Sequence, residues 1–151
     1  MLNPIPQCDY ILHDDGVHEF IFVEAEREAV DWHLKKLIEL REALPEGAPL
    51  CYIVNASKGK LPPLRYTFDR TRQELRKINF LKDAYAVGIT KDNAMFSMVS
   101  TIGLSIMPQS SLKMFTEDKY DEARVWLRRM AEHTPRIHGF DGSWWYSGGS
   151  T

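Results

Sequence analysis

Short apolar segments alternate with helix-forming segments along most of this chain, and that alternation constrains its fold more than any other feature. Apolar segments occur at 50–54, 84–90 and 112–115, and helical patterns occur at 27–44, 64–78, 94–107 and 120–133. Strands that alternate with helices pair in parallel, with right-handed crossovers. The pattern predicts one α/β domain whose mixed, largely parallel sheet has four or five strands and about four helices.

An N-terminal β-hairpin is expected before the first helix. Residues 10–13 and 17–24 flank Asp14-Asp15-Gly16, and an Asp-Gly pair between β-forming residues is a strong turn signal because glycine accepts positive φ. In the second of these strands both faces carry apolar residues. We therefore expect the second strand to lie inside the sheet rather than at its edge.

The strand-to-helix junction at 50–79 is the expected position of a functional loop. The carboxyl edge of an open α/β sheet commonly carries binding sites, and helix N-termini attract anions. Here the loop contains Ser57, Lys58 and Lys60, followed by a Pro pair. Lys58 and Lys60 are candidates for docking an anion or a partner. The alternative is an ordinary solvated loop, because no phosphate-binding glycine pattern is present.

The helix after this loop is basic. Arg65, Asp69, Arg72 and Arg76 recur along one face, and Asp69 is placed to pair with the arginines on either side. One hypothesis is that Arg65, Arg72 and Arg76 dock an acidic partner. The alternative is a soluble outer helix that faces the acidic N-terminal segment, residues 1–31.

The predicted helix 94–107 has no charged residue, and Phe96, Met98 and Met107 lie off its core stripe. A helix that is apolar nearly all round must be covered by something. The C-terminal tail, residues 136–151, contains Trp144, Trp145 and Tyr146 and is a candidate cover, in the same chain or in a neighbouring copy. We expect the folded domain to span residues 1–135.

Three segments together resemble the STAS / SpoIIAA-like family, whose best-known members are bacterial anti-sigma-factor antagonists. They are Leu50-Cys51-Tyr52-Ile53-Val54-Asn55-Ala56-Ser57, the strand and helix at 84–107, and 113–118 leading into 121–127. The resemblance implies a SpoIIAA-like fold and function through protein–protein contact. The antagonists carry a phosphorylatable serine at the N-terminus of the helix after the first of these segments. Residues 60–64 contain no hydroxyl, which leaves Ser57 as the phosphorylation candidate.

Composition excludes several classes of function. The net charge of −2 argues against a dedicated nucleic-acid binder. The longest uncharged run, residues 93–112, is too interrupted to span a bilayer. Pro4, Pro6 and Asp9 stand where a signal peptide needs basic and then apolar residues, and the cysteines Cys8 and Cys51 suit a reducing, cytoplasmic protein.

Catalytic groups are not evident. Cys51 lies in an apolar strand, where a thiol is usually inert, and the five histidines lack zinc-binding spacing. His33 borders the core stripe of its helix and is expected to be partly buried. We therefore expect no cofactor, no metal and no enzymatic activity. The sequence favours a non-catalytic interaction module that forms a homodimer; the alternative is a carrier of a small apolar ligand or lipid, of the Sec14-like type, with Phe96, Met98 and Met107 lining its pocket.

Overall fold

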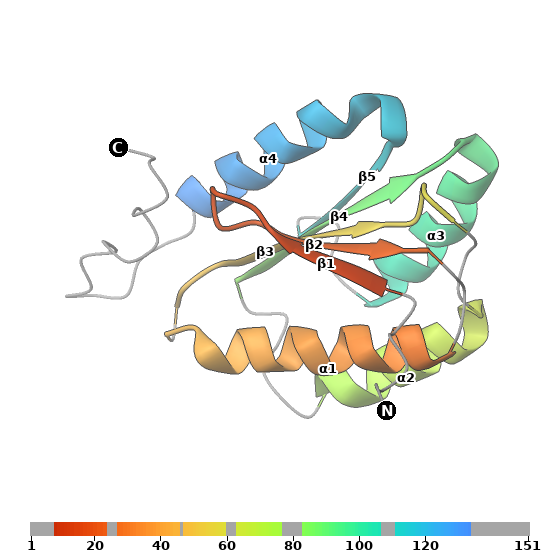
Figure 1. The fold of residues 1–151 in the computed structure, drawn as a ribbon, viewed down its shortest axis with the longest axis horizontal. Coiled ribbons are helices and arrows are strands. Elements are labelled where there is room, and N and C mark those ends of the chain that lie inside the picture. Colours follow the sequence, from red (N-terminus) through yellow and green to blue (C-terminus); the bar gives the residue numbers. More distant parts are fainter. Residues whose placement is uncertain are drawn as a thin grey trace, which may run out of the picture.

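The computed structural model describes residues 8–23, 27–45, 47–59, 63–76, 83–106 and 111–133 (Figure 1). These residues form a five-stranded sheet with four α-helices and one 3-10 turn. The elements in chain order are β1 (Cys8–Leu12), β2 (His18–Phe22), α1 (Arg27–Ala43), β3 (Leu50–Asn55), α2 (Leu64–Arg76), β4 (Ala84–Thr90), α3 (Asn93–Ile106), β5 (Leu112–Thr116), η1 (Glu117–Lys119) and α4 (Tyr120–His133). The predicted α/β class and order of elements are confirmed.

The strands lie in the sheet in the same order as in the chain, β1-β2-β3-β4-β5. β1 pairs antiparallel with β2, and the three remaining pairs are parallel. β2 is therefore an inner strand, as its two apolar faces predicted. Because each parallel connection moves one strand along the sheet in the same direction, right-handed crossovers place successive helices on the same side.

Two layers of helices enclose the sheet. In Figure 1, α1 and α2 lie below it and α4 lies above it, while α3 lies beside β4 and β5 and contacts α2. On the lower side Phe20, Leu34 and Leu50 belong to a buried apolar cluster. On the upper side Ile53 and Leu127 belong to a second one. The core therefore consists of two apolar layers, one on each face of the sheet.

Local signals in the sequence account for two of the turns. In the hairpin, Gly16 has φ 85°, and its N–H donates to the His13 carbonyl at 3.0 Å. Before α3, the Asp92 carboxylate accepts a hydrogen bond of 2.9 Å from the Met95 N–H and so caps the N-terminus of that helix. Both turns place polar side chains at the ends of the sheet.

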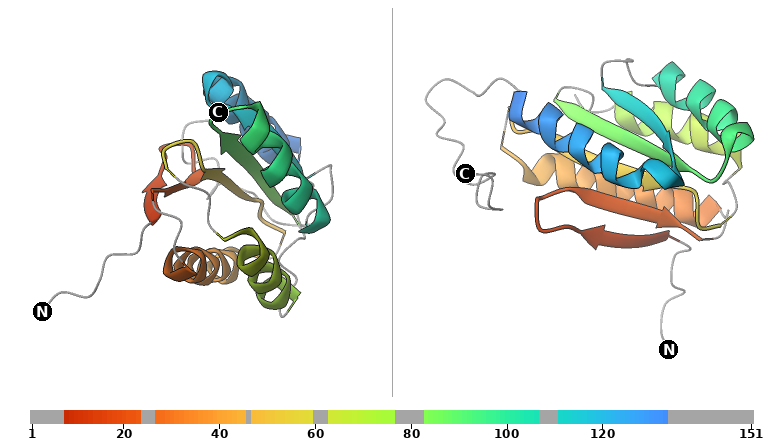
Figure 2. Two further views of the ribbon diagram at one scale, coloured as in Figure 1. Left: turned by 90° about the vertical axis from the view of Figure 1, so that its right-hand side faces the viewer. Right: turned by 90° about the horizontal axis from the view of Figure 1, so that it is seen from above.

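The upper layer does not cover the whole sheet. Seen from above, α4 crosses the sheet beside the hairpin and leaves the outer strand β1 uncovered (Figure 2, right). The helix packs mainly against β3, β4 and β5. The hairpin therefore presents a strand edge and part of one sheet face without a helix above it.

Candidate functional site

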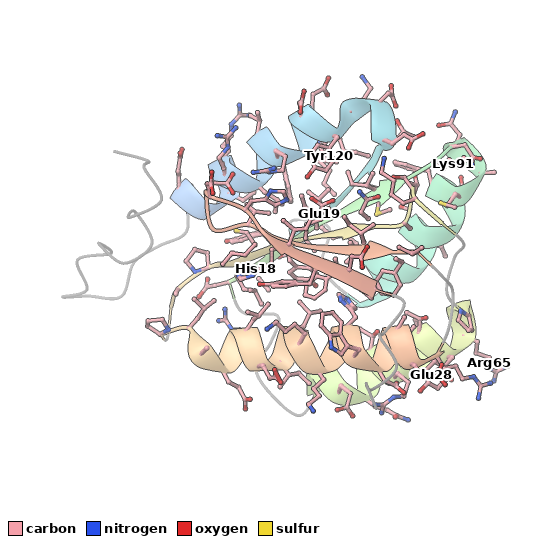
Figure 3. The ribbon with its side chains drawn as sticks, in the orientation of Figure 1. His18, Glu19, Glu28, Arg65, Lys91 and Tyr120 are labelled. Atoms are coloured by element: carbon pink, nitrogen blue, oxygen red, sulfur yellow. The ribbon has the colours of Figure 1, made fainter. Side chains whose placement is uncertain are left out.

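A buried acidic side chain lies between the sheet and α4. Glu19 in β2 is 3% exposed, and Figure 3 shows it on the α4 side of the sheet, below Tyr120. Its carboxylate accepts hydrogen bonds from Asn55 Nδ2 at 3.0 Å, from His13 Nε2 at 2.7 Å and from the Tyr120 hydroxyl. A buried carboxylate is stable only where such donors replace its water shell. The fold supplies these donors from the hairpin, from β3 and from α4.

These contacts determine the charge of Glu19. Burial alone would raise the pKa of its carboxyl, but the hydrogen bonds from Tyr120, Asn55 and His13 outweigh burial and hold the pKa below its usual range. For Tyr120, burial and the hydrogen bond to Glu19 raise the pKa to about 12. At neutral pH the pair is therefore an ionised carboxylate and a protonated phenol.

His13 extends this network toward the hairpin turn. Its Nδ1 lies 3.3 Å from Nη1 of Arg124, and its Nε2 bonds Glu19. Because the guanidinium can only donate and the carboxylate can only accept, the hydrogen of a neutral imidazole is assigned to Nε2. Both ring nitrogens are then occupied by protein partners.

An ion pair completes the connection to α4. Arg124 Nη2 lies 2.8 Å from Asp15 Oδ2, and the Val17 N–H donates to Asp15 Oδ1 at 3.2 Å. Burial would raise the pKa of Asp15, but its bonds with Arg124 and the Val17 N–H hold it below its usual range. We refer to His13, Asp15, Glu19, Asn55, Tyr120 and Arg124 as the Glu19 cluster. The cluster connects the hairpin turn with the first two turns of α4.

The hydrogen bonds and the ion pair within the Glu19 cluster limit the catalytic roles that its side chains could take. A general base needs a lone pair that faces a substrate, and a nucleophile needs an activating neighbour. The carboxylate of Glu19 already has three donors, and the imidazole of His13 is bonded on both sides. Within the described residues, Arg124 Nε is the one buried polar atom of the cluster that has no hydrogen-bond partner. The arrangement fits a structural connection better than a catalytic centre.

Ser57 follows the last residue of β3 by two positions, and its hydroxyl is part of a local turn. Its Oγ donates to Asn55 Oδ1 at 2.6 Å, and its N–H donates to the same oxygen at 3.0 Å. The side chain is 7% exposed. A kinase could reach this hydroxyl only after the turn opens.

The loop that follows passes close to the end of β2. A Cβ atom added at Gly59 would overlap the carbonyl group of Val23. Glycine at this position therefore allows the β3–α2 loop to lie against the backbone of the neighbouring strand.

A cleft of about 420 Å³ lies beside the Glu19 cluster, at the end of the molecule that carries the hairpin turn. The hairpin, the segment before β3 and the last turns of α4 line it, with Leu12, Leu44, Leu127 and Ala131 among its apolar residues. Cys51 also contributes to its wall, but burial raises the pKa of that thiol to about 12. The walls also carry the polar side chains of His13, Asp14, Asp15, His18 and Arg128, so the cleft is mixed in character, and it holds no reactive thiolate.

Two histidines lie on the α1 side of the sheet. The imidazole of His18 accepts or donates a 2.6 Å hydrogen bond with the Tyr10 hydroxyl, and His33 packs edge-on against Phe20, with ring centroids 4.4 Å apart. Burial lowers the pKa of His18 to about 4 and that of His33 to about 3. Both are neutral at pH 7: His33 is buried, as expected, while His18 is partly buried and lines the cleft.

Among the basic residues predicted to dock a partner, Lys58, Arg65 and Arg72 are exposed. The ion pairs described for α2 belong instead to Arg70, which contacts Asp31 of α1 and Glu74 at 3.2 Å each. Arg72 lies over the ring of Phe68, 5.2 Å from its centroid. Lys60 and the side chain of Arg76 lie outside the described residues.

Of the apolar surface predicted around helix α3, the structure describes the side chain of Phe96, which is partly buried. Met107, Trp144, Trp145, Tyr146 and the side chain of Met98 lie outside the described residues. The contacts of α3 with α2, β4 and β5 provide part of the cover that an uncharged helix needs.

The Glu19 cluster was not predicted, although the sequence contained a signal for it. Glu19 lies between Val17 and Ile21 on one face of a strand that is otherwise apolar on both faces. A charged residue at such a position must be exposed or paired. Its partners could not be named from the sequence, because Asn55 and Tyr120 are distant in the chain.

The exposed apolar side chains are concentrated on the hairpin. Four large apolar side chains among the described residues are more than 40% exposed, and three of them, Ile11, Leu12 and Val23, belong to β1 or directly follow β2. The fourth is Val125 on α4. The hairpin is thus the most apolar part of the described surface.

Among the described residues, no helix is both long and apolar enough to cross a membrane. The His, Cys, Asp and Glu side chains of these residues form no group of three or more that could hold a metal ion. In comparisons with known proteins, no protein-family model, no curated protein and no solved structure matches this chain.

Proposed function

We propose that this chain is a non-catalytic interaction module that self-associates through the hairpin side of its sheet. The observation that carries the proposal is the exposure of Ile11 and Leu12, at 43% and 59%, on the edge strand β1, with Val23, 42% exposed, directly after the neighbouring strand β2. Clustered exposed apolar side chains are a common mark of a protein–protein contact surface. The resemblance to the STAS family points to the same class of function.

The state of the titratable groups supports a role without catalysis. In the Glu19 cluster the carboxylate and the imidazole are bonded to protein groups rather than open to a substrate. The thiols of Cys8 and Cys51 are buried, and burial raises the pKa of each to about 12. Groups in these states are poor nucleophiles and poor bases at neutral pH.

Sedimentation velocity of the full chain over a wide concentration range tests self-association. We expect a dimer whose fraction rises with concentration, and we expect Leu12→Lys to raise its dissociation constant at least about tenfold, because an ammonium group would be buried in an apolar contact. Val125→Lys is the matched control, since Val125 is similarly exposed at 44% but lies on α4. A chain that stays monomeric at every concentration would overturn the proposal.

A carrier of a small apolar ligand is the second candidate, and the cleft of about 420 Å³ favours it. Ligand sites commonly have volumes of about 300–1,000 Å³, with mainly apolar walls and a few polar groups. Native mass spectrometry of protein purified without detergent would detect a retained molecule. Ala131→Phe, which fills the cleft, should abolish the added mass, whereas Val125→Phe on the outer side of α4 should keep it. A ligand-free spectrum from both the native chain and a lipid-incubated sample would reject the carrier.

A further inference from the structure

Among the described residues no strand pairs with the outer edge of β1, where backbone groups point outward at alternate residues. The His13 N–H donates to the Val17 carbonyl at 2.9 Å, and this pair continues the β1–β2 register in which Ile11 lies opposite Glu19. In an antiparallel ladder the residues that bond the neighbouring strand alternate with those that point away from it. Asp9 and Ile11 therefore bond β2, while Cys8, Tyr10 and Leu12 direct their N–H and C=O groups outward. Cys8 is 5% exposed and Leu12 is 59% exposed, so the edge is most open at the end nearer the hairpin turn.

β1 carries one exposed charge, Asp9, but none of the lysines, prolines or bulges that most often prevent an edge strand from pairing. β1 reads CDYIL and pairs with β2 without a bulge. At the opposite edge of the sheet, β5 carries the exposed Lys113 and has α3 packed beside it. Of the two edges, β1 is the one open to another strand.

We propose that β1 pairs antiparallel with β1 of a second copy of this chain, with the two-fold axis at Tyr10, so that the two sheets become continuous. This inference rests on the self-association proposed above and specifies its interface. A two-fold axis perpendicular to the sheet leaves each side chain of the second copy on the same face of the joined sheet as in the first copy. Residues opposite each other in antiparallel strands must also lie on the same face. Both conditions are met only when the axis passes through a residue of β1, which then lies opposite the same residue of the second copy.

Centring the register on Tyr10 satisfies the outward groups of the whole strand. Tyr10 then lies opposite the partner's Tyr10, and Cys8 lies opposite the partner's Leu12, so each outward residue exchanges hydrogen bonds with an outward residue. Leu12, the most exposed large apolar side chain described at 59%, gains a neighbour across the interface.

The same register accommodates the only charge on β1. Asp9 lies opposite the partner's Ile11 rather than opposite a second Asp9, so no acids face each other across the axis. Like charges directly opposite in a sheet are unfavourable. A second copy of β1 is therefore a better occupant of this edge than an acidic strand.

Disulfide trapping between two different single variants tests the register. Asp9→Cys and Ile11→Cys change exposed positions, and in the proposed pairing these two are opposite each other with Cα atoms about 4.5 Å apart, which a disulfide can span. The native thiols should not interfere, because burial keeps Cys8 and Cys51 largely protonated. The full-length variants, distinguished by a mass tag, would be equilibrated together at mildly alkaline pH and oxidised with diamide.

We expect a disulfide-linked heterodimer in the mixture, at a yield at least about tenfold above the linked homodimer in either variant alone. Linkage of Ile11→Cys to itself would overturn the register, since it would place the axis at Ile11. If sedimentation shows a dimer but no linked product forms, the interface lies elsewhere: this inference fails while self-association stands. A monomeric native chain would reject both.

Discussion

The hydroxyl of Tyr120 in α4 donates a hydrogen bond to the buried carboxylate of Glu19 in β2, joining two residues 101 positions apart in the chain. Tyr120 is the first residue of α4, and Glu19 lies in β2, the second strand of the hairpin. The contact therefore fixes the start of the last helix over the first parallel strand of the sheet. It also helps to keep the charged Glu19 carboxylate in the core, where that charge is stable only while its hydrogen-bond donors remain in place.

Removing the phenol should weaken this connection by a predictable amount. Tyr120→Phe deletes one donor and leaves Glu19 with Asn55 and His13, so we expect a loss of about 1–2 kcal/mol in the free energy of unfolding. Glu19→Ala leaves three buried donors without an acceptor and should cost about 2–4 kcal/mol. Urea denaturation monitored by circular dichroism measures both.

A double variant distinguishes a direct interaction from general loss of packing. If Tyr120 acts through Glu19, the change caused by Tyr120→Phe should shrink in the Glu19→Ala background, with a coupling energy above about 0.5 kcal/mol. Additive effects would show that the two residues stabilise the fold independently.

His33 should make the protein less stable in mild acid. Burial lowers the pKa of His33 from its ordinary value of 6.5 to about 3. Below pH 6.5 the unfolded chain therefore binds a proton that the folded chain excludes, so stability falls as the pH drops from about 6.5 toward 3, by about 1.4 kcal/mol per pH unit. Between pH 7.5 and 5 this one residue should account for about 2 kcal/mol.

His33→Leu tests this assignment. The variant should lose about 2 kcal/mol less than the native chain between pH 7.5 and 5, measured by urea denaturation at each pH. Val125→Leu is the control, because this change at an exposed position of α4 leaves every titratable group in place. An unchanged pH dependence in His33→Leu would show that His33 takes up its proton in the folded state.

Two glycines should differ in their tolerance of alanine. A methyl group at Gly59 would overlap backbone atoms of Val23, whereas one at Gly88 would overlap the end of the Met114 side chain. The backbone at Val23 cannot move aside as easily as the flexible Met114 side chain. We therefore expect Gly59→Ala to lower the free energy of unfolding by about 2–4 kcal/mol and Gly88→Ala to lower it by about 1 kcal/mol. The melting temperatures of the two variants, measured by thermal unfolding, would show which change costs more.

Met114→Ala provides the check on this ranking. Combined with Gly88→Ala, it should remove the overlap, so the double variant should be more stable than the sum of the two single changes predicts. Equal costs for the two glycine variants would contradict the backbone contact at Gly59.

The native thiols should be almost unreactive toward a disulfide reagent at pH 8. Burial raises the pKa of Cys8 and of Cys51 from 9.0 to about 12, which reduces the thiolate fraction of each about a thousandfold. Colorimetric titration of the native chain should therefore be slow, and the chain unfolded in guanidinium should release both equivalents at once. Rapid reaction of Cys51 in the folded chain would show that the cleft beside it admits the reagent.

Much of the fold could be predicted because its signals are local. The apolar run at 84–90 coincides with β4, the Asp-Gly turn forms the hairpin, and Asp92 caps α3. Each of these depends on residues within a few positions of one another. The expected pairing of Asp69 with its neighbouring arginines was less informative, since α2 contacts α1 through Arg70 and Tyr66, which both bond Asp31.

The candidate surfaces were harder to predict. The sequence predicted contact surfaces at the loop 57–60, at helix 94–107 and in the tail, whereas three of the four large apolar side chains described as exposed lie on β1 or directly after β2. Exposure depends on which strand ends at the edge of the sheet and on where α4 lies. Neither is encoded in the periodicity of one segment.

By itself, the sequence determined the elements of this protein, their order and the parallel sheet that they imply, because periodicity and turn chemistry act over a few residues. Only the tertiary structure decided that Glu19 lies within reach of Asn55, His13 and Tyr120 and that β1 has a free edge. Such contacts join residues that are far apart in the chain. Their hydrogen bonds and burial exist only once the strand order and the positions of the helices are fixed.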